Sequence, residues 1–301
     1  MLSINNLTKR FGKTLAINNI SFNVDSGNIF GVLGPNGAGK STILRSILNI
    51  IQPNSGEILI DSLPHNKFNS DKIGYLPEDR GLYQRSRVDD VLKYFGKLKS
   101  LSKSDVNNKI EFWSNKFELQ HQLSKYVYEL SKGNQQKVQF LISIIHDPDI
   151  LILDEPFTGF DPINQKLILE IIKDFESRGK IILLSTHMLE LAEKFCSEII
   201  LINEGEKIIS GNLSEIKSNY NSSKYLVEFT GDTESLNSSE MIHELNFENG
   251  KLKLTAESTT RSSQLLNFLI SKGEVSHFQK LEPSLTDIFF DSINKVKQTE
   301  Q

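Results

Sequence analysis

Residues 34–41 read G-P-N-G-A-G-K-S, which has the spacing G-x-x-x-x-G-K-S that suits a phosphate-binding loop. Such a loop turns several backbone N–H groups toward one point, and its glycines leave room for the phosphate because they carry no Cβ atom. Lys40 can reach the β- and γ-phosphates of a nucleotide there, and the Ser41 hydroxyl can bind Mg²⁺. The pattern therefore predicts a site for a nucleoside triphosphate.

The segments on both sides of this loop have the periodicity that such a site needs. Residues 29–33 form a short apolar run that is typical of a buried parallel strand. Residues 42–49 place Ile43, Leu44 and Ile47 on one face of a predicted helix. The N-terminus of that helix contributes about half a positive charge beside the phosphates. A glycine-rich loop that binds nothing is the alternative, and the flanking elements and the Lys-Ser pair weigh against it.

Two further predicted strands end in side chains that can do chemistry. Residues 150–153 are all apolar and lead directly into Asp154 and Glu155. Residues 180–184 form another buried strand, which ends at Ser185-Thr-His187. Because α/β sheets bind their ligands at the carboxyl ends of parallel strands, we expect these side chains to lie near the phosphate loop.

The remaining segments group into blocks with different hydrophobic periods. Residues 2–7 and 15–24 alternate as antiparallel strands on either side of a turn at residues 9–13, and a helical block covers about residues 84–146. A polar stretch at residues 219–223 marks a boundary. We therefore expect a nucleotide-binding domain over residues 1–218, which contains the helical block as a subdomain, and a small α+β domain over residues 219–301.

The second predicted domain shows no catalytic constellation. Its pattern predicts a strand at residues 225–229, a hairpin at 241–255 that turns at Asn249-Gly250, a helix at 260–272, a strand at 274–281 and a short helix at 284–290.

Composition excludes several classes of protein. The chain has 301 residues and a net charge of −4, so it offers no broad basic surface for nucleic acid. Its single cysteine, Cys196, excludes an intrachain disulfide and fits a reducing compartment. No apolar run is long enough to span a membrane, and the N-terminus begins with a strand-like segment instead of a signal peptide.

Three further motifs follow the phosphate loop in order: Leu130-Ser-Lys-Gly-Asn-Gln135, Leu153-Asp-Glu-Pro156 and Ser185-Thr-His187. With the loop, they resemble the nucleotide-binding subunit of an ATP-binding cassette (ABC) transporter, over residues 1–215. The segment that begins at Leu130 is peculiar to this family among phosphate-loop ATPases. The resemblance implies an α/β fold: a P-loop NTPase ABC cassette with a RecA-like core, an antiparallel β subdomain and a helical subdomain, followed by a small C-terminal α+β domain.

The resemblance also implies which residues bind the cofactors ATP and Mg²⁺. Phe11 matches the aromatic residue that stacks on adenine. The phosphates are held by the whole loop: Gly34, Pro35, Asn36, Gly37, Ala38, Gly39, Lys40, Ser41 and Thr42. The implied Mg²⁺ ligands are Ser41, Asp154 and Glu78.

Catalytic roles follow from the resemblance in the same way. Glu155 matches the general base that activates the attacking water, which a carboxylate can do because it accepts a hydrogen bond from water. His187 matches the switch residue that contacts the γ-phosphate. Lys40 and Glu78 complete the implied catalytic set.

Other motifs of the family imply that two subunits share each site. Ser131 and Gly133 match residues that contact the γ-phosphate bound to the other subunit, and Asp161 matches the loop that crosses to the partner. The implied assembly is a head-to-tail dimer with ATP between its subunits, made of two copies of this chain or of one copy and a paralogous ATPase subunit. Opening and closing of that dimer is the work stroke.

Two segments depart from the family pattern. In the Leu-Ser-Gly-Gly-Gln signature, Lys132 and Asn134 replace a glycine and the glutamine, whereas Ser131 and Gly133 are kept. Glu78 stands where the family usually has glutamine after Tyr-x-Pro. It keeps an oxygen ligand, loses the NH₂ donor and adds a negative charge. We hypothesise that Glu78 faces Mg²⁺ or a water molecule bound to it.

The chain is similar to bacterial ABC ATPases with a C-terminal accessory domain, including subunits of sodium-efflux-type exporters. The similarity rests on these two departures, on residues 75–83 and on the tail at residues 282–290. The implied function is an ATP-hydrolysing subunit that powers a separate integral membrane permease, on the cytoplasmic face of the cell membrane, without a nucleic-acid partner. A soluble ABC ATPase that acts on the ribosome or on DNA is the alternative. A regulator that binds but does not hydrolyse nucleotide is disfavoured by Glu155 and His187.

Overall fold

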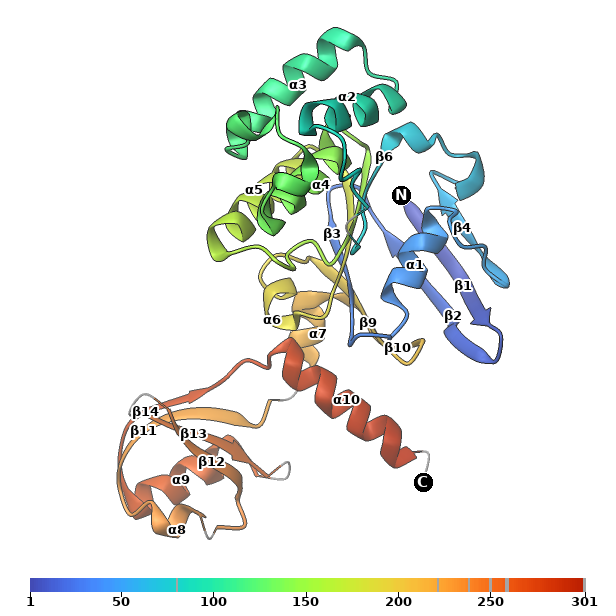
Figure 1. Cartoon of the computed structure of the whole chain (residues 1–301). Coiled ribbons are helices and arrows are strands. Elements are labelled where there is room, and N and C mark those ends of the chain that lie inside the picture. Colours follow the sequence, from blue (N-terminus) through green and yellow to red (C-terminus); the bar gives the residue numbers. More distant parts are fainter. Residues whose placement is uncertain (80, 221, 238, 249–250, 258–259, 300–301) are drawn as a thin grey trace. The chain divides into compact units, whose positions relative to one another are not determined.

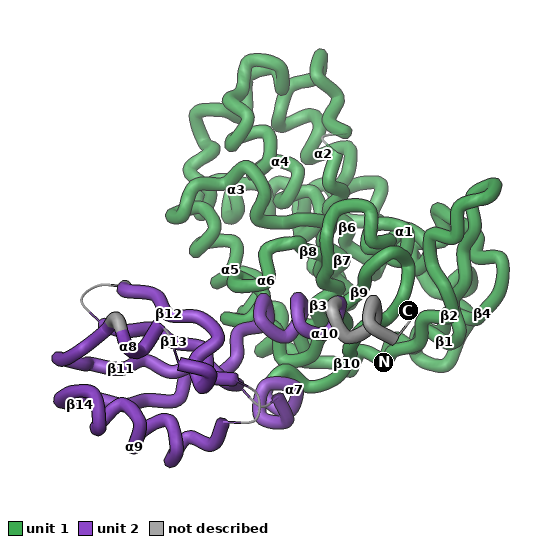
Figure 2. The backbone as a smooth tube through the Cα atoms, turned by 90° about the horizontal axis from the view of Figure 1, so that it is seen from below, with its two compact units in different colours: residues 1–213 green, residues 214–301 purple. Residues whose placement is uncertain are grey.

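The computed structural model of the chain describes residues 1–299 except residues 80, 221, 238, 249–250 and 258–259. The chain divides into two compact units, residues 1–213 and residues 214–301 (Figure 2). The division falls at the start of helix α7 (Leu213–Asn219), ahead of the polar stretch that marked a boundary in the sequence. Each unit mixes helices and strands, as the sequence predicts.

Six strands form the central sheet of the first unit, in the order β10-β9-β3-β8-β7-β6. Their bounds are β3 Ile29–Leu33, β6 Ile73–Leu76, β7 Ile150–Asp154, β8 Ile181–Thr186, β9 Glu198–Asn203 and β10 Glu206–Asn212. Neighbours pair in parallel, apart from β10, which is antiparallel to β9. Strands β3, β7 and β8 are buried along their whole length, as expected where both faces of a parallel sheet are covered. Their carboxyl ends therefore lie at one edge of the sheet.

Helix α1 (Lys40–Ile47) packs between this sheet and a second, antiparallel sheet. Phe30 and Val32 of β3 share one core cluster with Ile43 and Leu44 of α1 and with side chains of the antiparallel strands. The antiparallel sheet has the order β2-β1-β4-β5, and its strands are β1 Leu2–Phe11, β2 Thr14–Val24, β4 Ser55–Ile60 and β5 Leu63–Pro64. Strand β1 extends to Phe11, so the connecting turn is shorter than the sequence suggested.

Helices α5 (Pro162–Ser177) and α6 (Leu189–Ala192) lie on the other face of the central sheet (Figure 1). The helical block consists of α2 Val88–Leu98, α3 Lys103–Lys116 and α4 Lys132–Ile144. Helices α2 and α3 approach closely at Gly96, where a Cβ atom would lie 2.7 Å from the Val106 side chain. Among the described residues, no helix is both long and apolar enough to cross a membrane.

The second unit has a sheet and a core of its own. The sheet has the order β12-β13-β11-β14, with β11 Lys224–Gly231, β12 Ile242–Glu248, β13 Lys251–Ala256 and β14 Gly273–Lys280. Helices α8 (Glu234–Asn237) and α9 (Ser262–Lys272) contribute Leu236, Leu265 and Leu269 to its core. The hairpin turn predicted at Asn249-Gly250 lies outside the described residues.

Helix α10 (Leu285–Thr299) is longer than predicted. The sequence indicated a helix that ends at residue 290, although Ile293 continues the apolar spacing four residues after Phe289. The helical backbone runs to Thr299, so the predicted end was wrong.

Candidate functional site

The phosphate loop connects β3 to α1 and adopts a backbone that requires glycine. Gly34, Gly37 and Gly39 have positive φ angles of 151°, 82° and 107°. A Cβ atom on Gly34 would lie 2.1 Å from the carbonyl oxygen of Ile202, and one on Gly39 would lie 2.5 Å from that of Ala16. A side chain at Gly34 or Gly39 would collide with the backbone of a neighbouring strand, so the loop can pack here only with glycine at both positions.

A cavity of about 330 Å³ opens at this edge of the sheet. It is lined by Ala16, Asn36, Gly37, Gly39, Lys40, Ser41, Thr42, Glu78 and Glu155. The volume is within the range of small-molecule sites. The structure thus brings the loop, Glu78 and Glu155 together, although they come from three separate segments of the chain.

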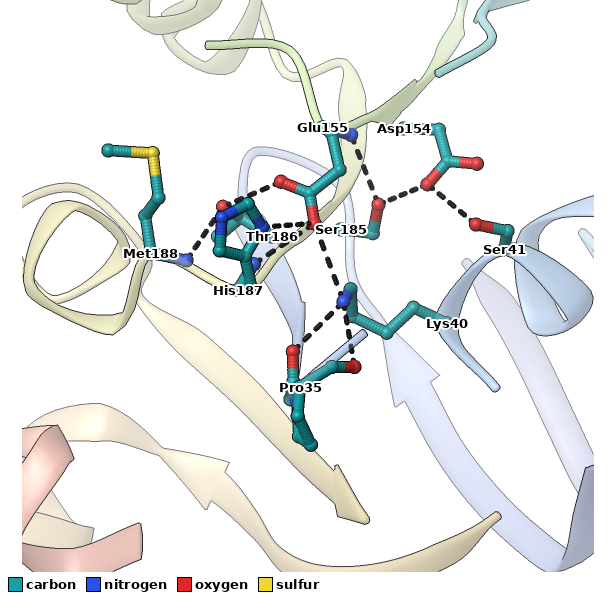
Figure 3. Close-up of polar contacts among 10 residues, drawn as sticks. Pro35, Lys40, Ser41, Asp154, Glu155, Ser185, Thr186, His187 and Met188 are labelled. Atoms are coloured by element: carbon teal, nitrogen blue, oxygen red, sulfur yellow. Dashed lines mark hydrogen bonds and ion pairs between the residues drawn. The ribbon is translucent and has the colours of Figure 1, made fainter. Parts of the chain in front are cut away.

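Lys40 is held within this cavity by oxygen atoms on two sides (Figure 3). Its Nζ atom donates hydrogen bonds to the carbonyl oxygens of Gly34 and Pro35, at 2.9 and 3.1 Å. It also lies 3.4 Å from Oε1 of Glu155, and both side chains are about 95% buried. The lysine is therefore fully engaged by protein acceptors.

Asp154 ends strand β7 and has one oxygen in use and one free. Its Oδ1 atom accepts hydrogen bonds from Ser185 and from the Ser41 hydroxyl, the latter at 3.1 Å (Figure 3). Its Oδ2 atom is buried and finds no hydrogen-bond partner in the part of the chain that the structure describes. Beside a serine hydroxyl, such an orphaned carboxylate oxygen suits a hard cation, so this donor set fits Mg²⁺.

Glu155 has a left-handed backbone, with a φ of 50°. Residues other than glycine rarely adopt that conformation, because it costs about 1–3 kcal/mol of conformational free energy. Those that do adopt it cluster at functional sites. The end of β8 holds the residue in place, because its N–H donates to Ser185 Oγ at 3.2 Å and its Oε2 accepts from Thr186 Oγ1 at 3.2 Å. The backbone N–H of His187 donates to Oε1 at 3.1 Å.

The imidazole of His187 reaches the same carboxylate. Its Nδ1 atom lies 2.9 Å from Glu155 Oε1, so the tautomer with a proton on Nδ1 donates a hydrogen bond there. Because Oε1 of Glu155 also faces Lys40, one carboxylate oxygen links the ends of β7 and β8 to the phosphate loop.

Ser131, Gly133 and Asp161 do not line this cavity. Ser131 is the N-cap of α4, where its hydroxyl accepts from the N–H of Asn134 at 3.3 Å. Asp161 is the N-cap of α5 and accepts from the backbone N–H of Asn164 at 2.9 Å, and this bond and the Asn164 side chain lower the pKa of Asp161. Both residues begin helices, where N–H groups can bind an anion.

Phe11 also lies outside the cavity lining. Its ring is 47% exposed at the end of β1, and the Lys9 ammonium lies 5.1 Å from the ring centroid. An exposed ring can stack on a base, so the implied contact with adenine stays a prediction.

Several residues of the site were missed by the sequence interpretation. Ser185 and Thr186 were seen only as neighbours of His187, yet their hydroxyls bind Asp154 and Glu155. Two hydroxyl residues at a strand end beside an acidic pair were the available signal. The sequence interpretation also missed Gln139 of α4, whose Nε2 atom donates to the carbonyl oxygens of Pro77 and Asp79. These contacts could not be found from the sequence because the partners lie about 60 residues away along the chain.

Two known protein families match this chain, one in each unit for most of the matched residues. The family described as "ABC transporter" matches residues 17–158. The family described as "ATP-binding protein DrrA1-3-like, C-terminal domain" matches residues 211–293. The chain is therefore a cassette followed by an accessory domain.

Similar proteins cover most of the chain. The ABC transporter ATP-binding protein YhaQ of Bacillus subtilis (strain 168) is 36% identical over 98% of this chain and 99% of its own length. The ATP-binding protein NatA of the same organism is 34% identical over 72% of this chain and 91% of its own length. Nod factor export ATP-binding protein I of Ralstonia nicotianae is 34% identical over 72% of this chain and 68% of its own length.

Solved structures agree with the fold of the first unit. An ATP-binding subunit of an ABC transporter has a TM-score of 0.68 at 28% identity, over 72% of this chain and 92% of that one. The dimeric cassette MJ0796 in a post-hydrolysis state, with ADP and Pi bound, has a TM-score of 0.65 at 25% identity, over 71% of this chain and 99% of that one. The predicted fold and ATPase activity are confirmed. The chain belongs to the ATP-binding proteins of ABC transporters, a family of ATP-hydrolysing cassettes, and carries a DrrA-like C-terminal domain.

Proposed function

We propose that this chain powers a separate membrane permease of an exporter, by closing head to tail on a second cassette when ATP binds and reopening after hydrolysis. The observation that carries the proposal is that the predicted site residues of one chain do not all lie around one cavity. Lys40 and Glu155 line the cavity, whereas Ser131 and Asp161 lie outside it at the starts of two helices. A second cassette, from another copy of this chain or a paralogue, would supply those contacts.

ATP binding changes the partners of Lys40 in this proposal. The lysine now donates to two neutral carbonyl oxygens and pairs with Glu155. The β- and γ-phosphates are charged acceptors, and charge-assisted hydrogen bonds are about twice as strong as neutral ones. Moving Lys40 to the phosphates leaves the Glu155 carboxylate free to accept a proton from the attacking water. His187 keeps that carboxylate oriented through its contact at 2.9 Å.

Mg²⁺ would be held by Ser41 and by the Oδ2 atom of Asp154, which has no hydrogen-bond partner among the described residues. The ion supplies positive charge that neutralises the phosphates during transfer. Glu78, on the wall of the cavity, would add a carboxylate oxygen. Ser185 fixes the other oxygen of Asp154 and so orients the free one.

Exposed aromatic rings in the segment that follows Glu78 in the sequence support a membrane partner. Tyr83 and Tyr94 are about half exposed, and their ring centroids lie 5.9 Å apart. We assign residues 84–100 and the Glu78 loop as the docking surface for the permease, since exposed aromatic rings are enriched in protein interfaces. The proposed location is the cytoplasmic face of the cell membrane. Export is favoured over import because similar proteins include a Nod factor export ATP-binding protein.

Capture of the partner tests the proposal. A tagged Glu155→Gln chain should stall with ATP bound, since the general base is lost, and should retain its partners during purification from native membranes. Mass spectrometry should then identify a multi-span membrane protein, and a matched preparation without ATP should recover less of it. Recovery of ribosomal proteins or DNA would instead establish the soluble ABC ATPase function.

A further inference from the structure

The side-chain amide of Gln139 joins helix α4 to the segment that carries Glu78. Its Nε2 atom donates hydrogen bonds to the carbonyl oxygens of Pro77 and Asp79, at 3.1 and 2.9 Å. These are the residues immediately before and after Glu78. Both amide hydrogens are therefore used to hold the backbone on either side of one cavity residue.

Packing alone does not explain a glutamine at this position. Gln139 is only 6% exposed and lies on α4 between Val138 and Phe140, which are fully buried. A buried amide is costly unless its hydrogen bonds are made, and an apolar residue of the same size would avoid that cost. The two bonds to the Glu78 segment are what this glutamine provides.

The C-terminal half of α4 is also fixed to strand β6, which precedes that segment. A Cβ atom on Gly74 would lie 2.1 Å from the carbonyl oxygen of Ser143, so helix and strand are in backbone contact there. His146, just after the helix, contacts the carbonyl oxygen of Ile73 at 3.2 Å. Helix α4 therefore contacts the Glu78 segment through Gln139 and strand β6 through its C-terminal end.

The other end of α4 is the signature segment. Ser131 caps the helix, and Gln139 lies about 12 Å further along its axis at 1.5 Å per residue. We propose that Gln139 is a positioning residue that couples the two nucleotide sites of the dimer. Phosphates bound in one site displace Glu78, and Gln139 passes this displacement along α4 to Ser131 and Gly133. Those two residues complete the other site. This inference rests on the proposed function, since it needs a second cassette opposite Ser131.

A double-mutant cycle between Glu78 and Gln139 tests the inference. Gln139→Met removes both donors at similar volume, and we expect it to lower kcat about tenfold, with a much smaller change in KM for ATP, within the usual range of coupling between sites. The cycle is measured at saturating Mg²⁺, so that a weaker contact of residue 78 with the ion does not limit turnover. If Gln139 acts through Glu78, then Glu78→Gln should lower kcat little further in the Gln139→Met background. Additive effects would overturn the inference.

Gln135 provides a matched control on the same helix. Its Nε2 atom also donates to two backbone carbonyl oxygens, those of Val127 and Leu130, but neither belongs to the Glu78 segment. The cycle between Glu78 and Gln135→Met should be additive. The same non-additivity in both cycles would show general loosening of α4 and would overturn the specific role of Gln139.

Hydrogen exchange tests the inference without turnover. In the Glu155→Gln background, ATP should slow exchange both in residues 34–41 and in residues 131–134. Adding Gln139→Met should keep the first change and remove the second. Equal protection of residues 131–134 with and without Gln139→Met would overturn the inference. Wild-type protein that does not hydrolyse ATP would instead contradict the proposed function. If the methionine variant folds poorly, Gln139→Asn, which keeps the amide but shortens its reach, replaces it and should likewise remove the protection of residues 131–134.

Discussion

The Nζ atom of Lys40 lies 3.4 Å from Oε1 of Glu155, and both side chains are almost completely buried. The cation assigned to the phosphates thus neutralises the carboxylate assigned to the attacking water. Because neither charge is solvated, loss of one partner would leave the other unpaired at considerable cost. The pair therefore makes release of Glu155 depend on arrival of another anion at Lys40.

Glu155→Gln should lower ATP turnover by at least about 100-fold while ATP still binds, since a positioned general base contributes about 10²–10⁴-fold. The amide oxygen of glutamine can still accept hydrogen bonds from Lys40 and His187, and the phosphates of ATP supply the negative charge that Lys40 has lost, so the ATP-bound loop should keep its structure. Steady-state hydrolysis and equilibrium binding of ATP measure the two effects. Glu57→Gln, at an exposed position on β4, is the control for loss of a charge. Turnover within about tenfold of the wild type would contradict the role of Glu155 as the base.

Glu78→Gln should raise the Mg²⁺ concentration needed for half-maximal turnover. Glu78 lies on the cavity wall, and a unit charge about 4 Å from an ion contributes on the order of 4 kcal/mol at an effective dielectric constant of about 20. Turnover measured as a function of Mg²⁺ concentration gives the shift. If turnover and its Mg²⁺ dependence are both unchanged, Glu78 does not face the ion or its water.

Ser185→Ala should destabilise the first unit by about 1–3 kcal/mol, because the buried Asp154 carboxylate loses one of the two hydroxyl donors to its Oδ1 atom. The Glu155 N–H keeps only the Ser185 carbonyl oxygen as its acceptor among the described residues. The substitution should also weaken the Mg²⁺ dependence of nucleotide binding, since Asp154 loses the hydroxyl that orients it. Ser143→Ala is the comparison, because that buried hydroxyl donates within its own helix, to the carbonyl oxygen of Phe140. Equal losses of stability in the two variants would show that the Ser185 contacts have no special weight.

Acid should destabilise the first unit through His146. Burial, reinforced by the nearby Lys99 ammonium, lowers the pKa of His146 to about 4 from its ordinary 6.5. Between these values the unfolded chain binds the extra proton, so stability falls as the pH drops from about 6.5 toward about 4. His146→Gln keeps a donor for the Ile73 carbonyl oxygen and should flatten this part of the profile. Urea midpoints of both proteins from pH 4 to 7 measure the difference, and parallel profiles would contradict the assignment.

The local parts of the site could be predicted because neighbouring residues define them. The strand, loop and helix around Lys40 lie in one continuous segment, and the apolar run before Asp154 marks a strand end. Parallel pairing of β7 with β8 then brings Asp154 beside Ser185. These relations follow from hydrophobic period and from the rule that ligands bind at carboxyl ends of strands.

The contacts that tune the site could not be predicted in this way. Gln139 reaches Pro77 and Asp79 across the fold, and nothing in its own segment signals that its amide is used. The pairing of Lys40 with Glu155 depends on side-chain conformations at the meeting point of two strands and a loop. The left-handed backbone of Glu155 also has no local signal, because glutamate has no preference for it.

The two hydrophobic cores bear on how the chain loses its structure. One core cluster draws its members from residues 2–202 and the other from residues 225–269, so each unit has its own source of cooperativity. A calorimetric scan should therefore show two transitions, and a single melting temperature would not be a defined property of the chain. A probe in the first unit alone, such as the fluorescence of Trp113, the single tryptophan, would follow the melting of the nucleotide-binding unit separately.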